Sequence, residues 1–207
     1  MKSLKKLAIA TSLLTFAAVS PAAADAAKPG QSMTHMKTTA GLSALLEGAG
    51  VIIYVQGGAT SAVMGDSVEA ANGQYVFHIP VTGTKSGVQH LGSNIVFFNT
   101  TNNKQVQLKN PVIDLATGQI SAVVAQAENK SMPILTITNA SALKAELSND
   151  RKLGTKTTAY KAAALSLAPG IGAALSSLLG LPDGSLPEGA GFGSADVTIY
   201  SKLSKKK

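Results

Sequence analysis

The sequence predicts a mainly β protein: an antiparallel β-sandwich or barrel-like domain that carries one or two short helices. Two observations favour this class. Apolar and polar residues alternate over several short segments, which is the period of a half-buried strand. Glycine, asparagine and proline separate these segments at short intervals. The chain also has no cysteine, so its stability must come from an ordinary buried core rather than from disulfides.

The first elements expected are a helix of one or two turns over residues 41–48 and an apolar strand over residues 51–55. The clearest alternation follows in residues 74–81, where one face of the strand is apolar. Pro80 removes a ladder donor, which favours an edge strand or a bulge. The residues expected on the core face are Tyr75, Phe77, Ile79 and Val81.

Two hairpins and one further strand are predicted in the middle of the chain. Turn residues at 99–104 and at Thr117-Gly118 separate runs that are apolar or alternate in polarity. The segments expected to pair are 94–98 with 105–108 in the first hairpin and 112–115 with 119–124 in the second, and 133–138 forms the next strand. Residues 140–147 have leucines at helical spacing, so that segment fits either a helix or a strand.

A helix between Pro169 and Gly180 is the clearest in the sequence. Proline is tolerated at the first helical position, and glycine accepts the left-handed conformation that ends a helix. The apolar stripe consists of Ile171, Leu175, Leu178 and Leu179, and it is expected to pack on the sheet. Residues 195–200 alternate again and predict a closing strand.

The N-terminal residues predict export. A basic start is followed by an apolar run over residues 7–19 and by small residues around Ala24 and Ala26. This is the order of a secretory signal peptide, which we assign to residues 1–26. The run is too short for a spanning helix, so no stable membrane span is expected after cleavage. The protein is therefore predicted to be secreted or periplasmic, in the cell envelope.

The remaining chain divides into three parts. Residues 27–40 are polar and are expected to form a flexible mature N-terminus, residues 41–203 a single β-rich domain, and residues 204–207 a basic tail. The formal charge is +7, but aromatic residues make up only 4% and are not interleaved with the basic ones. Nucleic-acid surfaces combine these features, so nucleic acid is not an expected partner.

The chemistry-bearing residues are few, and their pattern predicts that the protein is not an enzyme. The sequence has no nucleophile elbow, phosphate loop or dinucleotide fingerprint, and its histidines and carboxylates are not clustered as a zinc site requires. Only His35, His78 and His90 can supply an imidazole. Among these, His90 lies between Gly87 and Gly92, where the backbone can approach closely, so His90 is the strongest candidate for a site.

Several stretches resemble the haem-transport-associated (HtaA-type) domain. The resemblance runs from about Gly41 to Tyr200, mostly through glycines, prolines and apolar positions. The segments that carry it are Gly87-x-x-His90-x-Gly92-x-x-Ile95-x-Phe97, then Val106 to Asp114, Gly118 to Val124, Lys161 to Leu179, and Gly189-x-Gly191-Phe192-Gly193-Ser194-Ala195-Asp196-Val197-Thr198.

This resemblance implies a secreted or surface-anchored β domain that binds haem through an axial Tyr supported by a His. The supporting role would fall on His90. The family's Trp-Gly and Tyr-containing segment corresponds to residues 41–48, which contain neither Trp nor Tyr, and Tyr54 is the nearest substitute. The first hypothesis is therefore a non-enzymatic binding module for haem uptake, with His90 and Tyr54 as ligand-binding residues and haem as the only cofactor.

The second hypothesis is a structural or adhesive cell-surface protein without a small ligand, whose partner is another cell-envelope protein. The polar turns rich in Thr and Asn suit this hypothesis equally well.

Overall fold

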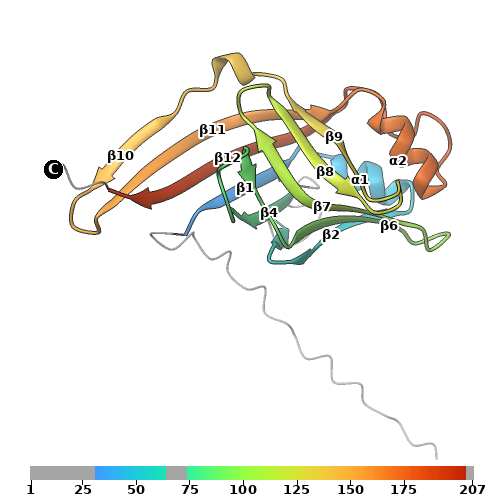
Figure 1. Ribbon diagram of the computed structural model, residues 1–207. Helices are drawn as coiled ribbons and strands as arrows, with labels where there is room; N and C mark the ends of the chain where they lie inside the picture. The colour runs from blue at the N-terminus through green and yellow to red at the C-terminus, as the bar shows by residue number, and fades with distance from the viewer. Residues whose placement is uncertain (1–30, 64–73, 204–207) are drawn as a thin grey trace, which may run out of the picture.

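The computed structural model describes residues 31–63 and 74–203, and these form one mainly antiparallel β-sheet with two α-helices (Figure 1). The predicted fold class is confirmed. The described strands are β1 (Met33–Thr38), β2 (Val51–Gly57), β3 (Thr60–Val63), β4 (Tyr75–Pro80), β5 (Val88–Gln89), β6 (Ser93–Asn99), β7 (Gln105–Asp114), β8 (Gln119–Val124), β9 (Lys130–Ile137), β10 (Glu146–Asp150), β11 (Thr155–Leu167) and β12 (Gly191–Lys202). The helices are α1 (Leu42–Gly48) and α2 (Ile171–Leu179), with a 3₁₀ turn at Ala140–Ala142.

The sheet is nearly closed into a barrel. Its strand order is β2-β6-β7-β8-β9-β11-β12-β1-β4-β3, with β5 beside β7 and β10 beside β11. The two ends of this order, β2 and β3, follow each other in the chain through a tight turn at Gly57 and Gly58. Curling the sheet on itself leaves one inner face, and that face holds the apolar core.

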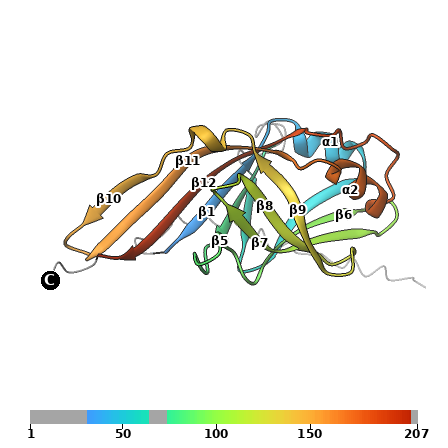
Figure 2. The same cartoon turned by 45° about the horizontal axis from the view of Figure 1, so that its top comes forward.

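Part of the sheet extends well beyond the barrel (Figures 1 and 2). We call this part the arm and define it as β10, residues 155–160 of β11 and residues 197–202 of β12. Residues 155–159 pair with β10, whereas residues 165–167 of the same strand pair with β9 in the barrel. A break in the β11–β12 register between Tyr160 and Ala163 separates the two halves. All five residues of β10 are exposed.

The predicted alternation of β4 is confirmed, because Phe77 and Ile79 are buried in the core and His78 lies on the other face. The expected late helix is also confirmed as α2, with Gly180 in the left-handed conformation at its C-terminal end. Pro169, however, is not its first helical residue. Gly170 is the N-cap and Ile171 begins the helix, so the proline precedes the cap.

Three other expectations need correction. Residues 33–38, which we placed in a flexible N-terminus, form β1 between β4 and β12. The two predicted hairpins pair as expected, but residues 105–108 and 112–114 belong to one continuous strand, β7, whose register shifts between Lys109 and Val112. Residues 140–147 form neither one helix nor one strand, because a 3₁₀ turn precedes β10. The predicted signal peptide, residues 27–30 and residues 204–207 lie outside the described residues.

Candidate functional site

His90 lies inside the barrel, only 1% exposed, in the tight turn between β5 and β6. Gly87 allows this turn to pack closely, since a Cβ on it would lie 2.6 Å from the Ile113 carbonyl oxygen. The backbone N–H of His90 donates to the Pro111 carbonyl at 3.0 Å. The turn is therefore fixed against β7 at the point where that strand changes register.

Both ring nitrogens of His90 have hydrogen-bond partners. Nδ1 lies 3.0 Å from the Pro111 carbonyl oxygen and Nε2 lies 2.8 Å from the Thr34 hydroxyl. A carbonyl oxygen can only accept, so Nδ1 carries the proton and Nε2 accepts from Thr34. Burial lowers the pKa of His90 below 6.5, and the hydrogen bond to Pro111 opposes this only in part. The imidazole is a neutral, fully satisfied core residue.

A small cavity lies beside His90. Its volume is about 20 Å³, which is the room that one or two water molecules need. Every residue lining it is buried, and apart from His90 and Thr34 the lining is apolar, with Met36, Ile79 and Ile95 among its residues. The cavity is therefore far too small for a porphyrin in this conformation.

Tyr54 lies on the opposite face of the sheet from His90. Its neighbours Ile53 and Val51 belong to the core, and strand alternation directs Tyr54 outward with the exposed Ile52. It pairs with Val96 of β6 and does not line the cavity beside His90 or the apolar cavity between α1 and α2. The structure thus does not bring the two predicted haem ligands together. Nor does His90 offer a free lone pair in this conformation, because both ring nitrogens are engaged in hydrogen bonds.

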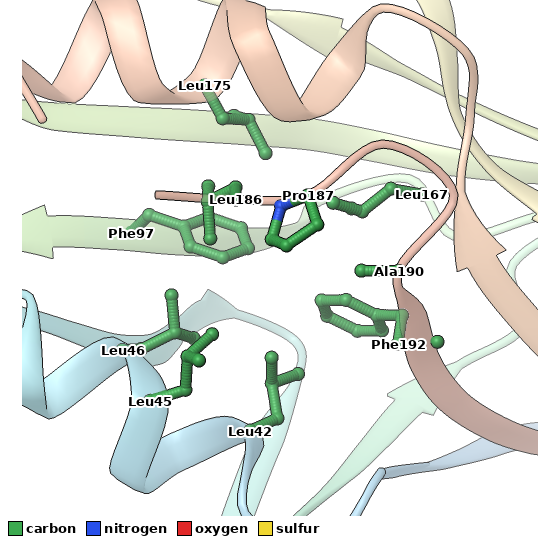
Figure 3. A pocket seen from close by; sticks show the side chains of 11 residues that line it. Leu42, Leu45, Leu46, Phe97, Leu167, Leu175, Leu186, Pro187, Ala190 and Phe192 are labelled. Atoms are coloured by element: carbon green, nitrogen blue, oxygen red, sulfur yellow. The ribbon is translucent and has the colours of Figure 1, made fainter. Parts of the chain in front are cut away.

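A second cavity opens at the end of the barrel, between α1 and α2 (Figure 3). We call it the α1–α2 pocket. Its volume is also about 20 Å³, but its rim includes residues that reach the surface, and Leu45 is 52% exposed. The lining side chains are wholly apolar. They are Leu42, Leu45, Leu46, Phe97, Leu167, Leu175, Leu186, Pro187, Ala190 and Phe192, with Gly191 completing the wall.

Two contacts hold the segment 182–190 across this pocket. The Glu188 carboxylate accepts from the N–H groups of Gly170 and Ala173, at 2.7 and 3.1 Å, which caps the N-terminus of α2. Gly172 lets the Leu186 carbonyl oxygen approach α2, because a Cβ at this position would lie 2.3 Å from that oxygen. One wall of the pocket therefore depends on a carboxylate and a glycine that the sequence analysis did not single out.

Helix α1 forms the other wall of the α1–α2 pocket. Side-chain hydrogen bonds hold this helix and the C-terminal end of α2 to neighbouring residues. Tyr75 donates from its hydroxyl to Glu47 at 3.0 Å, and burial together with this carboxylate raises the pKa of Tyr75 to about 12. At the C-terminal end of α2, Asn99 and Asn102 both donate to the Leu179 carbonyl at 2.9 Å. Both helices are thus attached to the barrel by side-chain hydrogen bonds that flank the pocket.

The two other histidines meet on the outer face of the sheet. His35 and His78 are directly opposite on β1 and β4, with their Nδ1 atoms 2.8 Å apart, and Asp196 faces His35 from β12. Burial, followed by His78, lowers the pKa of His35, whereas Asp196 opposes this effect. Among the described residues no group of three His, Cys, Asp or Glu side chains is arranged to hold a metal ion.

Comparisons of the chain with protein-family models, with curated proteins and with solved structures gave no match. Across residues 31–63 and 74–203, no helix has the length and apolar character needed to cross a bilayer.

Proposed function

We propose that this chain is a non-enzymatic binding module that acts outside the cytoplasm and takes an apolar small molecule in the α1–α2 pocket. The observation that carries the proposal is the combination of an apolar lining with a rim at the surface. Ligand sites are typically concave and mostly apolar. The cavity at His90 lacks the second property, because every residue that lines it is buried.

A ligand larger than a few atoms needs the pocket to widen, and the segment 182–190 is the wall best suited to move. It contains no helix or strand. Its described hydrogen bonds to α2 are the two from Glu188. Moving residues 182–189 of this segment would extend the space between Leu45 and Pro187, while the Ala190 carbonyl keeps its hydrogen bond from the Leu167 N–H of β11 at 3.0 Å.

Haem is the ligand that the HtaA-type resemblance implies. The apolar lining of the α1–α2 pocket determines how haem would bind there. No lining side chain carries a nitrogen, a hydroxyl or a sulfur. A porphyrin would therefore be held by its apolar ring, with no contribution from iron ligation. Metal-free protoporphyrin should bind about as well as haem.

The test is a spectroscopic titration of the chain from Ala27 onward with haemin and with metal-free protoporphyrin. We expect saturable changes of similar affinity for both, weakened by Leu45→Asp at the rim. Ala44→Asp is the matched control, because Ala44 is exposed on the same helix and does not line the pocket. Binding of neither compound, or binding that Leu45→Asp leaves unchanged, would overturn the proposal.

Titration of His90→Ala and Tyr54→Phe separates the proposal from iron ligation. If haemin binds much more tightly than metal-free protoporphyrin and either variant removes that difference, iron ligation by these residues replaces the apolar pocket as the basis of binding. Equal affinities that neither variant changes support the pocket.

A structural or adhesive surface protein is the second candidate, and the arm favours it. β10 is an edge strand whose five residues are all exposed, and exposed edges pair readily with other chains. Under this hypothesis, binding to isolated cell envelopes would be lost on deletion of residues 144–154 and would be insensitive to Leu45→Asp. The opposite pattern would reject it.

A further inference from the structure

The far end of the arm gathers basic residues from separate parts of the chain. Arg151 and Lys152 lie in the turn between β10 and β11, and Lys156 follows on β11. Lys202 is brought beside them because it pairs with Thr155 across β11 and β12. The Leu203 N–H also donates to the Gly154 carbonyl at 2.9 Å, which fixes the end of β12 to this turn. We call these residues, with Leu153, the arm tip.

The charge of the arm tip is not neutralised by its surroundings. All four basic side chains are exposed, and no described carboxylate forms an ion pair with them. The nearest acidic residue, Asp150, uses its carboxylate to accept from the N–H groups of Lys152 and Leu153 at 2.9 and 3.0 Å. In the sequence, Lys205, Lys206 and Lys207 follow Leu203 within four residues.

Exposed leucines accompany these charges. Leu153 lies in the turn itself and is 59% exposed, and Leu147 on β10 is 64% exposed. Leu147 and Lys156 lie on the same face of the arm. Lys156 is directly opposite Asn149 in the β10–β11 register, and Leu147 is two residues before Asn149 on β10, so its side chain points to the same side. Leu153 therefore places an exposed apolar side chain beside the charges of the turn.

We propose that the arm tip docks on the surface of a bilayer that contains anionic lipid. The basic side chains contact the headgroup phosphates while Leu153 enters the boundary with the acyl chains. A soluble polyanion would satisfy the charges but leave the leucines in water, which is why the lipid surface fits better. The arm carries the tip away from the barrel (Figure 2), so docking leaves the α1–α2 pocket free. This proposal does not depend on the proposed ligand.

The experiment is co-sedimentation of the chain from Ala27 onward with vesicles of phosphatidylcholine, with and without phosphatidylglycerol. This form keeps every described residue and lacks the apolar segment of the predicted signal peptide. We expect binding only to the anionic vesicles, weakening as salt rises. Each basic residue near an anionic surface is worth about a fivefold change in partitioning, so Lys152→Gln with Lys156→Gln should lower binding roughly 25-fold.

The matched control is Lys104→Gln with Lys130→Gln, which removes the same charge from exposed positions outside the arm. Leu153→Ser tests the apolar contact, and it should weaken binding to vesicles while leaving binding to heparin, a soluble polyanion, unchanged. Equal losses in the two double variants would show that net charge alone drives binding. An inert Leu153→Ser variant would point to a soluble polyanion. Either result, or no binding to anionic vesicles, overturns the proposal.

Discussion

Protonation of His90 should make the domain less stable in acid. In the folded chain its Nδ1 proton is donated to Pro111 and its Nε2 lone pair accepts from Thr34. Protonation of Nε2 would remove the lone pair that accepts from the Thr34 hydroxyl. It would also put a positive charge on a side chain that is only 1% exposed. Burial therefore lowers the pKa of His90 in the folded state.

The sign and size of the effect follow from proton linkage. In the unfolded chain the imidazole titrates near its ordinary pKa of 6.5. Above pH 6.5 both states are neutral and stability is complete. As the pH falls toward the folded pKa, only the unfolded state takes up the proton, so the free energy of unfolding falls by up to about 1.4 kcal/mol per pH unit. The pKa of His35 is also lowered, so it adds a slope of the same sign.

Urea denaturation at a series of pH values below 7 would measure this slope in the wild type and in two variants. His90→Gln keeps a donor for Pro111 and an acceptor for Thr34 but cannot titrate, and His35→Gln is the matched change at the half-buried histidine. We expect His90→Gln to remove the larger part of the slope. A slope that His90→Gln leaves intact would refute the assignment of His90 as a neutral core residue.

Three further substitutions test the contacts around the pocket and the arm. Gly172→Ala should lower the free energy of unfolding by about 1–3 kcal/mol, because its Cβ would overlap the Leu186 carbonyl, and an unchanged melting temperature would contradict this. Glu188→Ala should lower the free energy of unfolding by about 1 kcal/mol, because the N-terminus of α2 loses its cap. Glu188→Gln is the control and should lower it less. If chemical denaturation gives equal losses for both variants, the charge of Glu188 rather than its hydrogen bonds stabilises the helix. Asp196→Ala should speed amide exchange in the arm but not in the barrel, since Asp196 accepts from the Ala162 N–H at 2.7 Å, and uniform acceleration would contradict a local role.

The strands that could be predicted are those with one face in the core. In β4, Phe77 and Ile79 alternate with more polar residues, and that alternation is directly visible in the sequence. β11 could not be found in this way. Residues 155–160 lie in the arm, where neither face is fully buried, so burial imposes no period of two on the sequence. Residues 33–38 were not predicted as a strand for a related reason. His35, Lys37 and two threonines make the segment polar in the sequence, so it resembles a tail rather than β1.

The α1–α2 pocket could be predicted only in part. Each of its side chains, such as Leu46 or Leu175, reads as ordinary core in its own segment. What makes them a pocket is that α1, α2, β6, β11 and the start of β12 meet at one end of the barrel, and this depends on strand order rather than on local pattern. Glu188 could not be predicted as a cap from the sequence. It follows α2 in the chain, so only the folded structure shows that it lies at the N-terminus of that helix.

The register break in β11 explains why the pocket and the arm tip can be treated as separate sites. Ala162 has a φ of +53°, a conformation that disfavours a side chain, and Asp196 accepts its N–H at 2.7 Å. Beyond this point β11 leaves β9 and pairs with β10 instead. Beyond Val197, which is still buried in the core, the residues of β12 in the arm are no longer buried, so the core ends close to where the arm begins. Because distant sites without shared partners act additively, a Leu45→Asp, Leu153→Ser double variant should lose ligand binding and vesicle binding independently.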